Sequence, residues 1–269
     1  FFLFPFFFSF SSPLVLLLTP SRPQDPEALD VETDDLIQSV FRYALDRIKN
    51  EPPLDGPLSE AELTALVGQT VTPEGLGGIE ALRRYPEHLA PASISADNPR
   101  YLAFVPGAPT KAAAVFDLVI GASSLCGSTW LDGAGMVFAE NQALRWIADL
   151  AGMPESAGGC FVTGGTIGNL SALVAARHDA NAKRSEAGLD RPTRWVMVAS
   201  EGTHSSIDSA ANVMDVDVVL ANADDSRRLR GDAVAAAIAG RPEGTEVFAV
   251  VATAGTTNLG IVDDLEGIA

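Results

Sequence analysis

Hydrophobic residues follow two different patterns along the chain, and the first of these predicts helices in the N-terminal third. The apolar positions that repeat at helical spacing after the polar linker at 21–30 are Leu36, Ile37, Val40, Phe41, Ala44, Leu45 and Ile48. Ser59 followed by Glu62 matches a capping box, and Thr72 followed by Pro73 matches an N-cap with proline at the first helical position. We therefore expect several short helices between residues 27 and about 92.

The pattern changes near residue 96, beyond which helices and strands are predicted to follow one another in turn. One helix is expected after Thr110 through Ala122, and another from about Met136 to Leu150. Three continuous apolar runs then follow, which are WVMVAS at 195–200, VDVVLAN at 216–222 and EVFAVVATA at 246–254. Such runs are typical of strands that are buried on both faces of a parallel sheet. The alternation predicts an α/β architecture.

A glycine-rich turn lies within the segment CFVTGGTIGNLSALVAARH at 160–178. Residues 163–168 are expected between a strand that ends near Val162 and a helix that runs from about Ile167 to His178. Unpaired amides at a helix start carry partial positive charge, and glycines let a phosphate approach the backbone closely. The residues alone leave two interpretations open, an anion-binding loop and a tight strand-to-helix turn.

Two further polar clusters follow predicted strands. The segment SEGTHSS places His204 after the first apolar run, and the segment TAGTTNLG places Thr256 and Thr257 after the third. Ligands of an open parallel sheet bind outside the carboxyl ends of its strands, so the three polar loops are expected to converge on one crevice. Taken singly, the histidine and the threonines are also explained as hydrogen-bonded loop residues.

Composition narrows the classes of partner. Against 18 Lys and Arg stand 35 Asp and Glu, and the net charge of -17 repels nucleic acid, which we exclude as a partner. Cys126 and Cys160 match neither a disulfide framework nor a metal site and are predicted to be reduced core thiols. Residues 1–20 hold seven of the 13 Phe and no charge, and three explanations stay open for them: an artefact of the assigned start, a signal anchor and a signal peptide.

Five separated segments share their order and spacing with one enzyme family. They are NPRYLAFVPGAPT (98–110), CGSTWLDGAGMVFAENQALRWIADLAGMP (126–154), GGCFVTGGTIGNLSALVAAR (158–177), SEGTHSSIDSAANV (200–213) and VVATAGTTNLGIVDDL (250–265). Over about residues 30–269 the chain resembles the group II pyridoxal-phosphate-dependent decarboxylases of aromatic amino acids, glutamate and diaminobutyrate. The resemblance implies the type I, aspartate aminotransferase-like fold, a mostly parallel α/β sheet flanked by helices. It divides the chain into a leader and linker at 1–26, a helical arm at 27–95 and an incomplete cofactor-binding domain at 96–269.

The resemblance also implies roles for single residues. The implied pyridoxal 5'-phosphate-binding positions are Gly164, Gly165, Thr166, His204 and Thr257. The implied substrate-side positions are Phe104, Pro106 and Gly107. His204 matches the histidine that stacks on the pyridine ring in the family and helps to orient the external aldimine, so it is the candidate catalytic residue. Trp130 and Glu140 match family positions that we expect to be structural.

The family's aldimine lysine and the aspartate that pairs with the pyridine nitrogen are not found here. In the family both lie downstream of the GTT motif, whereas Lys49, Lys111 and Lys183 all precede it. We interpret the chain as an inactive N-terminal fragment of an enzyme that converts an L-amino acid into an amine and CO2. Two alternatives are a truncated paralogue that acts as an interaction module and another type I enzyme, such as an aminotransferase.

The family works as a homodimer, so the helices between residues 30 and 92 are expected to face the partner subunit. An amino acid, as a small-molecule substrate, is the expected ligand, and the cytoplasm is the expected location. No membrane partner is expected unless residues 1–20 form a real anchor.

Overall fold

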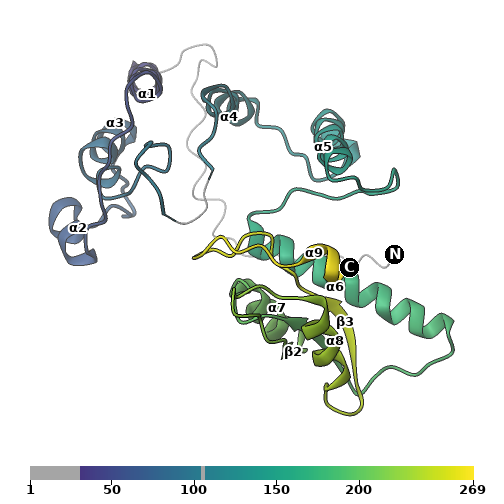
Figure 1. The fold of residues 1–269 in the computed structure, drawn as a ribbon. Helices are drawn as coiled ribbons and strands as arrows, with labels where there is room; N and C mark the ends of the chain where they lie inside the picture. Colours follow the sequence, from purple (N-terminus) through teal and green to yellow (C-terminus); the bar gives the residue numbers. More distant parts are fainter. Residues whose placement is uncertain (1–30, 104–106) are drawn as a thin grey trace. The chain divides into compact units, whose positions relative to one another are not determined.

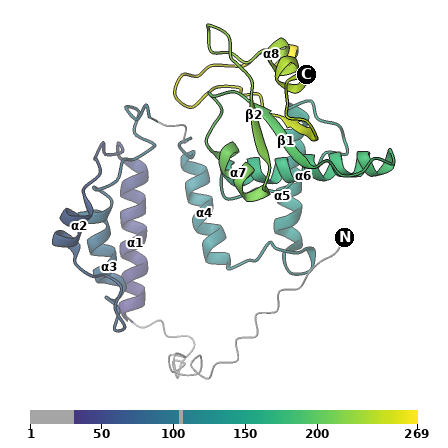
Figure 2. The same cartoon turned by 90° about the horizontal axis from the view of Figure 1, so that it is seen from below.

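The computed structural model describes residues 31–103 and 107–269, which belong to two compact units, 1–113 and 114–269 (Figures 1 and 2). Each unit is built around its own helices, and only the second contains a sheet in the described part of the chain. The predicted domain boundary after residue 95 stays a prediction.

Unit 1 consists of short helices, as the sequence predicts. They are α1 (Val31–Lys49), α2 (Glu60–Val67), α3 (Gly78–Arg84) and the π-helical turn η2 (Tyr85–Leu89). The capping box is confirmed, because the Ser59 hydroxyl accepts from the amide of Glu62 while the Glu62 carboxylate accepts from the amide of Ser59. The predicted helix start at Thr72 and Pro73 is wrong. Gly75 and Gly77 have φ of 72° and 75°, which is left-handed backbone, so the next helix begins only at Gly78.

Unit 2 contains a parallel three-stranded sheet with the strand order β2-β1-β3. Its elements are α6 (Gly165–Glu186), β1 (Arg194–Ala199), α7 (Ser206–Met214), β2 (Asp217–Leu220), α8 (Gly231–Ala239), β3 (Thr245–Val250) and α9 (Leu265–Ile268). Val196 of β1 pairs with Asp217 of β2 and with Val247 of β3. All three predicted strands are present, and the α/β architecture is confirmed.

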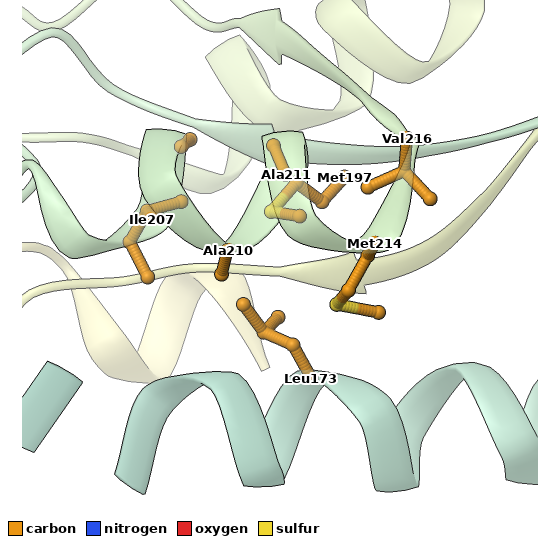
Figure 3. Packing of buried hydrophobic residues seen from close by; sticks show 8 residues of the cluster. Leu173, Met197, Ile207, Ala210, Ala211, Met214 and Val216 are labelled. Carbon is orange, nitrogen blue, oxygen red and sulfur yellow. The ribbon is translucent and has the colours of Figure 1, made fainter. Parts of the chain in front are cut away.

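The core lies on both faces of β1, the central strand. Met197 and Ala199 belong to the cluster between β1 and the helices α6 and α7, in which Leu173 of α6 points toward Ala210 and Met214 of α7 (Figure 3). Val198 points the other way, into a second cluster with α8. Burial on both faces is therefore confirmed for β1 alone. The edge strands β2 and β3 are half-buried, because each has a described neighbour on one side only.

Two further helices, α4 (Lys111–Ser123) and α5 (Trp130–Leu150), precede α6. α5 begins six residues before the predicted Met136, because the amide and hydroxyl of Thr129 donate to Asp132 at 3.1 and 2.7 Å and so cap an earlier first turn. Cys126 and Cys160 are both exposed, so the prediction of core thiols is wrong. None of the helices described in either unit is long and apolar enough to cross a membrane.

Candidate functional site

The loops that follow the sheet strands line a pocket of about 620 Å³ at the carboxyl edge of the sheet. Glu201 and Gly202 follow β1, Asn222 follows β2, and Thr256 follows β3. The second and third predicted clusters therefore meet at this edge, which is where ligands of open parallel sheets bind. The pocket is lined by Thr256, whereas Thr257, the residue named by the resemblance, is exposed in the next turn.

Charges of both signs line this pocket, from Glu201, Asp224 and Arg227. The amide of Arg228 and the guanidinium of Arg230 donate to Asp224 and lower its pKa, so that this lining residue stays ionised. Thr256 has a structural role here, since its hydroxyl accepts from the amide of Ile261 at 3.1 Å. Free backbone amides at a helix start are the other kind of partner that an anion can use.

The glycine turn offers such partners. Gly164 is the N-cap of α6 with φ of 129°, and the first amide that bonds within the helix is that of Gly168. No side chain caps this end, so the amides of Gly165, Thr166 and Ile167 remain available as donors in the described part of the chain. No heavy atom lies within 4 Å of a Cβ built at Gly164 or Gly165, so the space above the turn is open. These features fit a phosphate group.

The turn differs from its predicted surroundings. The strand expected before it, ending near Val162, is absent from the described structure, and the helix spans Gly165–Glu186 instead of 167–178. The backbone before the turn is bonded to α5 instead of to a strand, because the amide of Phe161 donates to Glu140 at 2.7 Å. Glu140 therefore has the structural contact expected of it, while Trp130 at the start of α5 is 61% exposed.

His204 is connected to α6 through hydrogen bonds. Its Nδ1 lies 2.9 Å from the hydroxyl of Ser206 and accepts from the amide of Ser206 at 3.1 Å. The side-chain amide of Asn169, in the second turn of α6, donates to the same hydroxyl at 2.8 Å. The first and second predicted clusters are thus joined by Asn169 and Ser206, two residues that sequence analysis missed although both lie inside the quoted motifs.

None of the substrate-side positions belongs to the described part of unit 2, which holds this site. Phe104 and Pro106 lie outside the described residues, and Gly107 is exposed in the loop before α4, in the other unit. His204 also lines a smaller pocket of about 250 Å³, together with Thr203 and Asp208. The described geometry of unit 2 therefore covers the implied cofactor-binding positions and not the implied substrate-side positions.

Comparison with known proteins finds the family that the five sequence segments resemble. A family model described as the pyridoxal-dependent decarboxylase conserved domain matches residues 81–269. The aromatic-L-amino-acid decarboxylase of Bacillus atrophaeus is 34% identical over 178 residues, covering 64% of this chain and 35% of that protein. The L-2,4-diaminobutyrate decarboxylase of Rhizobium meliloti is 34% identical over 159 residues, covering 57% of this chain and 30% of that protein.

Solved structures share the fold. The crystal structure of mouse CSAD matches with a TM-score of 0.77 at 24% identity, covering 90% of this chain and 52% of that one. Oryza sativa TDC with PLP and tryptamine matches with a TM-score of 0.75 at 22% identity, covering 91% and 53%. The chain thus spans about a third of the length of these two relatives and about half of these structures. The likeness confirms the predicted α/β fold class.

Proposed function

The chain belongs to the family of pyridoxal-dependent decarboxylases, and we infer that it forms the phosphate-binding part of an enzyme that converts an L-amino acid into an amine and CO2. The cofactor of the family is pyridoxal phosphate. The observation that supports this function best is the uncapped glycine turn at the start of α6, joined by hydrogen bonds to the loop of His204.

The first turn of α6 would hold the cofactor phosphate. The amides of Gly165 and Thr166 have no partner among the described residues, and Gly164 supplies the backbone conformation that keeps the turn open. The hydroxyl of Thr166 would add a side-chain donor. α6 has no acidic residue in its first turn and has Lys183 and Arg184 in its last, so its dipole and its charges both favour an anion at its start.

His204 would lie against the cofactor ring, and Thr257 would complete the contacts from the β3 side. When bound, the cofactor accepts the electron pair that the departing carboxylate leaves on the substrate. The residues of this chain position that ring, because the Ser206 contacts fix His204 and the phosphate contacts fix the other end. Phe104, Pro106 and Gly107 are proposed to face the substrate.

No lysine of unit 2 stands near the turn. Lys183 lies 17 residues beyond Thr166 in α6, which is about 26 Å at the rise of an α-helix, and forms an ion pair with Asp179 at 2.8 Å. We therefore expect the residues of unit 2 to bind the cofactor without a covalent bond, and the chain, which the resemblance implies is an inactive fragment, to release no CO2.

A second copy of the chain is the proposed macromolecular partner. α1 presents an apolar stripe to solvent, in which Phe41 is 53% exposed and Leu45 is 50% exposed. Exposed apolar surface of this kind marks interfaces between protein chains. Sedimentation equilibrium of the chain should give twice its mass of 28.1 kDa, and a monomer at high concentration would contradict the proposed dimer.

Cofactor binding tests the proposed function directly. The chain is titrated with pyridoxal 5'-phosphate, with pyridoxal and with inorganic phosphate, and binding is followed by equilibrium dialysis. The phosphorylated cofactor should bind most tightly, and inorganic phosphate should compete with it. Equal binding of pyridoxal and pyridoxal 5'-phosphate would refute a phosphate site at α6.

A further inference from the structure

Ser206 lies at the centre of the hydrogen bonds that join α6 to His204. Its side chain is 2% exposed, and its hydroxyl contacts both Asn169 at 2.8 Å and His204 at 2.9 Å. Asn169 and Ser206 are 37 positions apart in the sequence. A buried hydroxyl with two specific partners has a fixed orientation, because any rotation would leave a buried polar group unpaired.

The same contacts determine which nitrogen of His204 carries the proton. The backbone amide of Ser206 can only donate, and it lies 3.1 Å from Nδ1, so Nδ1 is an acceptor and carries no proton. Because the side-chain amide of Asn169 donates to the Ser206 hydroxyl, the hydroxyl proton is free to donate to Nδ1 as well. In the neutral ring the proton is then on Nε2.

α6 and α7 form a rigid support for these contacts. Leu173 of α6 packs against the α7 side chains (Figure 3), and the guanidinium of Arg177 donates to the carbonyl oxygen of Met214 at 2.7 Å. The distance between Asn169 on α6 and Ser206 at the start of α7 is therefore fixed by packing. Any group bound at the start of α6 is held in register with the ring of His204.

We propose that Ser206 and Asn169 are positioning residues that hold His204 as the Nε2-protonated tautomer and tie its ring to the phosphate-binding turn of α6. The proposal rests on the proposed function, since the ring matters only if it meets a cofactor whose phosphate lies at that turn. The proposal makes Nε2 of His204 a hydrogen-bond donor. The hydrogen-bond chain that fixes this proton position begins at Asn169 on α6.

The test is nitrogen NMR of the ligand-free chain with ¹⁵N-labelled histidine, at about pH 8.5, where an ordinary histidine is neutral. The ring nitrogens of the two neutral tautomers have different shifts, and the chain has only three histidines to assign. His204 should show Nε2 protonated. Ser206→Ala keeps the backbone amide that donates to Nδ1 but removes the hydroxyl, so the tautomer ratio should shift about fivefold toward Nδ1–H, the change expected on losing one of the two hydrogen bonds.

Asn169→Asp provides a second, nearly isosteric variant at an exposed position, so it tests the proposal even if Ser206→Ala fails to fold. A carboxylate cannot donate, so the Ser206 hydroxyl turns toward it and Nδ1 loses the same bond. Ser205→Ala is the matched control, because the Ser205 side chain makes no capping bond to α7. His178, farther along α6, should keep its shifts in every folded variant and reports an intact helix.

The same samples are then titrated with pyridoxal 5'-phosphate, and the ring nitrogen shifts of His204 are followed. This titration separates a failure of the positioning role from a failure of the proposed function. A wild-type ring protonated on Nδ1, or an unchanged tautomer ratio in both Ser206→Ala and Asn169→Asp, overturns the positioning role. A tautomer ratio that responds to these variants while His204 shows no response to the cofactor supports the hydrogen-bond chain but refutes the proposed function. A tautomer ratio that responds to the variants, together with a His204 ring that responds to the cofactor, supports both the positioning role and the proposed function.

Discussion

Replacing Thr166 with aspartate should separate the stability of α6 from its capacity to bind an anion. Thr166 is the second residue of a 22-residue helix that has no acidic residue in its first turn and no side-chain cap. A carboxylate at this position interacts favourably with the helix dipole and the free amides, which is worth about 0.5 kcal/mol of added stability. If the turn were only a tight connection, Thr166→Asp would raise the stability of the helix and leave the affinity for pyridoxal 5'-phosphate unchanged.

The same carboxylate should weaken the binding of a phosphate at this turn, although it stabilises the helix. Two unit charges 4 Å apart repel by about 1 kcal/mol in water, so a doubly charged phosphate loses about 2 kcal/mol beside the new carboxylate. Losing the Thr166 hydroxyl as a donor costs about 1 kcal/mol more. The sum of about 3 kcal/mol corresponds to a weakening of about 100-fold in cofactor affinity.

The assay measures both quantities on the same protein. Unfolding in urea is followed by circular dichroism, and affinity for pyridoxal 5'-phosphate is measured by equilibrium dialysis. Thr166→Asn is the matched control, because asparagine has the shape of aspartate without its charge and should weaken binding about fivefold at most. Equal affinities of Thr166→Asp and Thr166→Asn would refute the placement of the phosphate at this turn.

Three further variants test contacts within the two units, two of them in unit 2 and one, at Glu80, in unit 1. Asp263 is 2% exposed and accepts two backbone amides at 2.7 and 2.8 Å, so Asp263→Ala should cost about 2–4 kcal/mol in urea unfolding, and a loss below 1 kcal/mol would contradict this. Leu173→Ala should cost about 2–4 kcal/mol by opening the α6–α7 core, whereas Val174→Ala, 44% exposed, should cost much less; similar losses would count against the packing. Hydrogen bonds, the largest from Arg83, lower the pKa of Glu80 from 4.5 to about 2, so its carboxylate stabilises the fold above pH 4.5 and this contribution is lost as the pH falls toward 2. The melting temperature of Glu80→Gln should therefore depend less on pH between 4.5 and 2 than that of the wild type. The same pH dependence in both proteins would contradict the stabilising role of the Glu80 carboxylate.

Local patterns predicted most of the elements in this chain. The apolar run at 195–200 becomes β1 because its alternate side chains meet helices on both faces, and the capping box at Ser59 forms between residues only three apart. Both signals depend on neighbouring residues, so sequence alone was sufficient. The order of the five motifs was also sufficient to indicate the family.

Long-range contacts explain what the sequence did not reveal. Asn169 looks like an ordinary helix residue until Ser206 is brought against it, and Glu140 binds a backbone amide 21 residues away. Neither pairing leaves a periodic signal. The exposure of Cys160 is a similar case, because it depends on the neighbours of its segment in the fold and not on the hydrophobicity of the residue.

The choice between an anion-binding loop and a tight turn, which the residues left open, depends on local charge. A net charge of -17 opposes an anion at long range, yet salt screens such fields beyond about 8–10 Å. Acidic residues occupy the first turn of α1, α2, α3, α5, α7, α8 and α9. α4 and α6 have none there. The start of α4 is capped by the Thr110 hydroxyl, which accepts from the amide of Ala113, whereas the start of α6 has no side-chain cap and is kept open by a glycine whose φ of 129° other residues rarely adopt. The backbone conformation and the missing carboxylate together favour an anion at this end of α6, in a chain whose overall charge would otherwise repel one.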